Sequence, residues 1–91
     1  MRRGALLALL AIPALAARAQ ADWKHEFEQV CAGTQDAMSL GLDELHSLIG
    51  RCDMLKPQIE ALGPSEKKVY AKRLQACRDL YAFVLRSREQ G

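Results

Sequence analysis

The sequence predicts an all-α protein: an antiparallel helical hairpin crosslinked by a disulfide. Three observations support this prediction. Apolar residues recur at steps of three and four along two segments, and no segment alternates as a strand would. A Gly-Pro-Ser turn separates the two segments. Two cysteines, Cys52 and Cys77, lie at nearly equal distances from that turn.

Residues 1–21 have the pattern of a cleaved secretory signal peptide. Arg2 and Arg3 precede the apolar run GALLALLAIPALAA, and A-x-A sites end at Ala19 and Ala21. Spanning a membrane takes about 20 apolar residues, so this run is too short for the alternative of an uncleaved anchor. No later segment predicts a transmembrane helix. We expect cleavage after Ala21 and export to the bacterial periplasm or the extracellular space; the bacterial assignment rests on the short, alanine-rich signal.

The chain after residue 21 forms a single small domain, 22–91. Its charge is close to neutral, because three of the thirteen Lys and Arg residues lie in the signal and all eleven acidic residues lie outside it. This balance gives no reason to expect nucleic-acid binding. A domain of this size needs a staple beyond its core, and an oxidising compartment makes a disulfide the natural one.

Three helices are expected. The first covers 22–32, with Asp22 as N-cap, Gly33 as its end and one apolar face formed by Trp23, Phe27, Val30 and Cys31. The second covers 42–62 and is kinked near Pro57, with a break into two helices as the alternative. The third covers 66–88 after Gly63, Pro64 and the N-cap Ser65.

Facing residues of a hairpin have positions that add to a constant, and for a Cys52–Cys77 disulfide this constant is 129. The same rule pairs apolar residues along both helices: Leu45 with Val84, Leu48 with Tyr81, Ile49 with Leu80, Leu55 with Leu74, and Ile59 with Tyr70. We therefore predict a Cys52–Cys77 disulfide, the alternative being two reduced core cysteines.

The first helix is expected to pack on the open end of the hairpin. The apolar residues expected there are Leu40, Leu42, Phe83 and Leu85. If the helix did not dock, Trp23 and Phe27 would form an exposed patch of the kind that contacts partners.

Charge is divided between the helices, and two interpretations are open. Residues 22–62 carry three basic and eight acidic groups, whereas 66–91 carry seven basic and three acidic groups. The first interpretation is mutual neutralisation within the hairpin. The second is a basic strip that binds anionic lipid or an acidic partner. This strip consists of Lys67, Lys68, Lys72 and Arg73.

No motif for catalysis, a cofactor or a metal is present in the sequence. There is no C-x-x-C-H, no glycine-rich phosphate loop, no G-x-S-x-G and no H-E-x-x-H. His25 and His46 are too isolated in sequence to suggest a zinc site. We expect no enzyme, no cofactor and no metal.

Cys31 is the cysteine left over, and three roles are open to it. It is a buried apolar residue, a free thiol that bonds to a second copy or another protein, or a competitor for Cys52 or Cys77. The leading hypothesis is a non-enzymatic interaction or structural module of the periplasm or envelope whose partner is another envelope protein, with the segment from Trp23 to Cys31 as its contact element. A homodimer through Cys31 or an exposed apolar face is a further arrangement. The alternatives are a thiol-dependent redox or assembly factor using Cys31, and a peripheral envelope binder using the basic strip.

Overall fold

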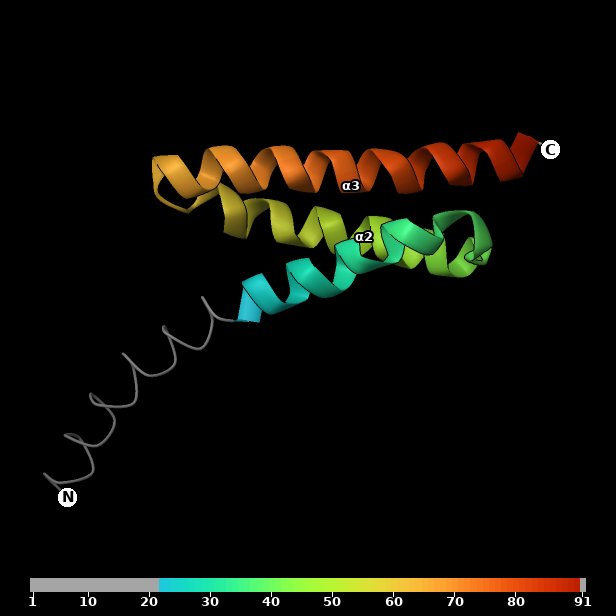
Figure 1. Cartoon of the computed structure of the whole chain (residues 1–91), viewed down its shortest axis with the longest axis horizontal. Coiled ribbons are helices and arrows are strands. Elements are labelled where there is room, and N and C mark those ends of the chain that lie inside the picture. The colour runs from blue at the N-terminus through green and yellow to red at the C-terminus, as the bar shows by residue number, and fades with distance from the viewer. Residues whose placement is uncertain (1–21, 91) are drawn as a thin grey trace, which may run out of the picture.

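The structure is a computed structural model and describes residues 22–90; the predicted signal peptide and its cleavage sites lie outside the described residues. The N-terminal helix (residues 22–32) continues into the 3₁₀ helix η1 (Gly33–Ser39). The long helices α2 (Leu42–Glu60) and α3 (Pro64–Gln90) follow. In Figure 1 α2 and α3 run antiparallel, and the N-terminal helix lies along the hairpin. The predicted all-α class is confirmed, since residues 22–90 contain no strand.

The turn between the long helices has the expected length but lies earlier in the chain, at 61–63 instead of 63–65. Pro64 begins α3, and the amide of Lys67 donates to the carbonyl of Gly63, so Gly63 is the N-cap. The prediction of Ser65 as N-cap was wrong because the fixed φ of proline suits the first helical position. Pro57 lies within the last turn of α2, which is one continuous helix, so the alternative of a break is excluded. The kink near Pro57 stays a prediction.

The predicted hairpin register agrees with the core. An ion pair joins Arg78 to Asp53 at 2.6 Å, and their positions add to 131, close to the expected 129. The predicted pair of Ile49 and Leu80 is the exception, because Leu80 is partly exposed and lines a groove with Cys31 and Thr34. The hairpin residues predicted to face one another that are buried are Leu45, Cys52, Leu55, Ile59, Leu74, Cys77, Tyr81 and Val84.

The N-terminal helix does not pack on the open end as predicted. The Trp23 and Phe27 rings meet Tyr70 edge to face, with centroids 5.0 and 5.1 Å apart. Tyr70 lies toward the closed end of the hairpin, and Phe83 at the open end stays exposed. The reason is the short connection through η1. It fixes the end of the helix near the start of α2, so the helix must run back toward the turn (Figure 1).

Candidate functional site: an apolar stripe on the last helix

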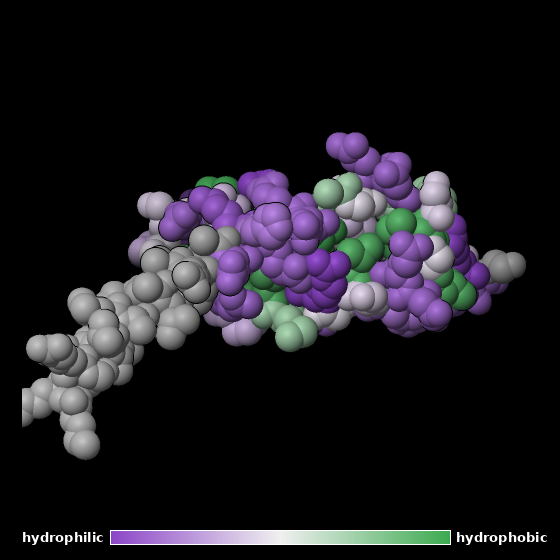
Figure 2. All heavy atoms as spheres, turned by 90° about the horizontal axis from the view of Figure 1, so that it is seen from below, coloured by the Kyte–Doolittle hydropathy of each residue, from purple (hydrophilic) through white to green (hydrophobic). Residues whose placement is uncertain are grey.

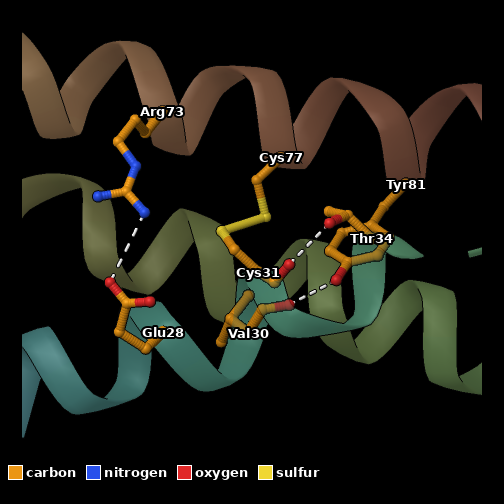
Figure 3. Close-up of a disulfide and its surroundings, with 7 residues drawn as sticks. All are labelled: Glu28, Val30, Cys31, Thr34, Arg73, Cys77 and Tyr81. Atoms are coloured by element: carbon orange, nitrogen blue, oxygen red, sulfur yellow. Dashed lines mark hydrogen bonds and ion pairs between the residues drawn. A yellow bond between two sulfur atoms is a disulfide. The ribbon is translucent and has the colours of Figure 1, made fainter. Parts of the chain in front are cut away.

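The disulfide joins Cys31 to Cys77, with the Cα atoms 5.7 Å apart, so the predicted Cys52–Cys77 disulfide was wrong. Figure 3 shows the bond passing from the N-terminal helix to α3. The pairing rule considered two helices only. A third helix in contact with the hairpin gives Cys77 a second neighbour, and Cys31 takes the bond. Cys31 is therefore neither a free thiol nor available for a disulfide-linked homodimer.

Polar contacts hold the surroundings of the disulfide in place. The hydroxyl of Tyr81 donates to the carbonyl of Val30, and that of Thr34 donates to the carbonyl of Cys31 at 2.8 Å. On the other side, the Arg73 guanidinium lies 4.9 Å from the centre of the Phe27 ring and reaches Glu28 (Figure 3). These contacts hold the N-terminal helix and α3 together on both sides of the disulfide, which indicates that the disulfide has a structural role.

Cys52 is the free cysteine, and it is buried with 1% of its surface exposed. Burial raises the pKa of its thiol to about 11, and the charge of Asp53 acts in the same direction. Arg78 and Arg51 lower the pKa, but burial dominates. A groove of about 370 Å³ between α2 and α3 runs past Cys52. A buried thiol with a raised pKa is a poor nucleophile, so Cys52 acts here as a small apolar core residue.

Of the other residues predicted to contact partners, the two aromatic ones are buried and the basic ones are exposed. Trp23 and Phe27 are buried, which removes them from the surface that a partner contacts. The basic residues of α3 are exposed, but they do not form one strip. Because a helix turns about 100° per residue, Lys68 and Lys72 share a side, whereas Lys67 and Arg73 point elsewhere.

A feature that the sequence interpretation missed is an exposed apolar stripe on α3, formed by Val69, Ala76, Leu80 and Phe83. It runs beside the N-terminal helix, because Ala76 and Leu80 line a shallow groove with Phe27, Cys31 and Thr34. Val69, Leu80 and Phe83 are 54%, 38% and 58% exposed. Together with Arg73 and Ser87, the stripe follows alternating steps of four and three, the spacing of a coiled-coil seam. The signal for it was present in the sequence: these residues recur at heptad spacing beside the residues of the buried face.

The remaining exposed large apolar residues do not extend this stripe. Met38 and Leu42 lie near the open end, and Met54 lies on α2. Figure 2 shows a face that is mainly hydrophilic, with hydrophobic residues in its middle and toward the right end. The α3 stripe is thus distinguished by three large exposed side chains and one alanine aligned on a single straight helix.

Residues 22–90 contain neither a cluster of metal ligands nor a helix that could span a membrane. His25 and His46 are exposed, and His46 lies 3.7 Å from Glu89. No group of three metal-ligating side chains is found in this range. None of these helices is long and apolar enough to cross a bilayer.

Comparison with protein families, curated proteins and solved structures finds no match to this chain.

Proposed function

We propose that this chain is an exported, non-enzymatic interaction module of the periplasm or cell envelope, and that the α3 stripe is its contact surface. The observation that carries the proposal is the exposure of Val69, Leu80 and Phe83 at heptad spacing on one helix. Water-exposed apolar side chains in that pattern gain free energy when another helix covers them. The partner is therefore expected to present an amphipathic helix.

The rigidity of α3 supports the proposal. The disulfide at Cys77 fixes its middle, and the Arg78–Asp53 pair ties it to α2. A preorganised helix loses little conformational entropy on binding, which favours affinity. The disulfide also suits an oxidising compartment, in line with the predicted export.

The two alternative functions have less support. A thiol-dependent factor was based on a free Cys31, and Cys31 is bonded to Cys77. For the envelope binder, Arg73 is engaged with Glu28 and two aromatic rings, which leaves Lys68 and Lys72 as its shared basic side.

Site-specific photocrosslinking in the producing cell tests the proposal. A benzoyl-phenylalanine at position 83 or 69 lies on the stripe, and one at position 71 lies on an exposed part of α3 at the groove between α2 and α3. We expect covalent protein adducts from positions 69 and 83 and none from 71. Adducts of equal yield from all three positions, or from none, would count against the stripe as a contact surface.

A further inference from the structure

We propose that the partner of the α3 stripe is a second copy of this chain, packed antiparallel about a two-fold axis at Ala76. This inference rests on the proposed function, because it names the partner for the same surface. A two-fold interface brings the same patch of both copies together, so its residues must be self-complementary. The stripe meets that condition at its two ends, and the charges on its flank meet it as well.

The ends of the stripe are symmetrical about Ala76, whereas in its middle Leu80 mirrors Lys72 and Arg73 mirrors Asp79. Val69 and Phe83 both lie seven positions from Ala76, and Ser65 and Ser87 both lie eleven positions from it. In an antiparallel pair centred on Ala76, each Val69 therefore packs against the Phe83 of the other copy. The serines meet at the two ends, where an interface becomes wet. The small Ala76 side chain at the centre lets the two helix backbones approach closely.

Charges on one flank of the stripe support the same arrangement. Lys72 lies four positions before Ala76 and Asp79 three positions after it, and both are exposed on the same flank. Antiparallel pairing places Lys72 of each copy beside Asp79 of the other, which makes two equivalent ion pairs. Parallel pairing would place Lys72 opposite Lys72 and Asp79 opposite Asp79. Within a single copy Lys72 has no ion pair among the described residues, and Asp79 accepts only a hydrogen bond from Gln75.

The size of the contact indicates a reversible dimer. The proposed contact, from Ser65 to Ser87, is about 33 Å long at about 1.5 Å per residue. One helix packed on one helix buries an area at the small end of specific interfaces. The dimer is therefore expected to dissociate on dilution.

Engineered cysteines test the geometry of the dimer in the otherwise unaltered mature chain. Facing residues at a helix contact are close enough for a disulfide. Under mild oxidation A76C should give a covalent dimer, because the two copies of that position meet on the axis. S65C and S87C should each stay monomeric alone and should crosslink when mixed. Homodimers from S65C alone would indicate parallel packing, and no crosslink from A76C would overturn the proposal. Peptide mapping checks that the native disulfide is intact.

A charge swap gives an independent test by sedimentation equilibrium over a concentration series. K72D and D79K should each weaken the dimer about tenfold or more, because each puts like charges side by side, and K72D/D79K should restore it. If both single variants weaken the dimer and the double variant does not restore it, the proposed pairing of Lys72 with Asp79 is contradicted.

The result also separates this inference from the proposed function. A wild-type chain that stays monomeric, with position 83 crosslinking to a different protein, overturns the homodimer and leaves the interaction module in place. A monomer without stripe adducts overturns both.

Discussion

The hydroxyl of Tyr81 on α3 donates to the backbone carbonyl of Val30 near the end of the N-terminal helix. This buried contact joins residues 51 positions apart in the sequence. Tyr81→Phe keeps the ring but removes this buried hydrogen bond, which should cost about 1–2 kcal/mol of unfolding free energy. Urea denaturation measures the loss. Tyr70→Phe is the matched control, because its hydroxyl has no hydrogen bond among the described residues, and a similar loss there would contradict the assignment.

Gly33 and Gly50 should respond in opposite ways to a methyl group. A Cβ at Gly33 would lie 2.8 Å from the buried hydroxyl oxygen of Tyr81, which is held by its hydrogen bond. Gly33→Ala should therefore destabilise the fold by about 1–3 kcal/mol. A Cβ at Gly50 meets nothing within 4 Å, and alanine is the better helix former there, so Gly50→Ala should stabilise by about 0.5–1 kcal/mol. Thermal unfolding of the two variants measures both effects, and equal shifts would contradict this prediction.

The Cys31–Cys77 disulfide should dominate the stability of the domain. It links residues 46 positions apart, and the chain-entropy model assigns about 4 kcal/mol to closing such a loop. Because small cores supply about 3–5 kcal/mol, the reduced protein should be largely unfolded. Circular dichroism with and without a reductant measures this. Cys52→Ala is the control, since it should keep the disulfide and its response to reductant; a Cys52–Cys77 peptide in the wild-type digest would contradict the assigned pairing.

The buried thiol of Cys52 should make the fold sensitive to alkali. Its pKa in the folded protein is about 11, above its ordinary value of 9.0, so the unfolded chain loses this proton first as the pH rises. Its contribution to stability is complete below pH 9.0 and declines toward pH 11. Burial also raises the pKa of Tyr81, so part of the decline will remain in any variant.

The contribution of Cys52 is measured by comparing how steeply stability falls with pH in the wild type and in Cys52→Ala. Urea midpoints measured from pH 8 to pH 11 should fall more steeply for the wild type. Parallel curves would show that the thiol titrates normally.

Much of the hairpin was predictable, because each of its helices buries one regular face. Leu45, Leu55, Leu74 and Val84 were all placed by the pairing rule, and all are buried. The rule works because antiparallel neighbours of equal rise keep their positions aligned along the whole contact.

The disulfide and the contact surface were not predictable in the same way. Cys31 shares a face with Phe27 and Val30, a sign that it lies against the hairpin, but a rule for two helices has no place for a third neighbour. Leu80 was assigned to the hairpin contact although it belongs to the exposed stripe with Phe83. The spacing of apolar residues along α3 shows that they fall on two adjacent faces. It does not show which of these faces the N-terminal helix will cover.

The position of the disulfide determines what happens to the chain when a protease cuts it once. Cys31 and Cys77 enclose η1, α2, the turn at Gly63 and half of α3. A single peptide-bond cleavage anywhere within that segment leaves two fragments that are still covalently joined. Nicked molecules would keep the intact mass, apart from one added water, until the sulfur bridge is reduced. The exposed turn at Gly63 can therefore be cut without the two halves separating.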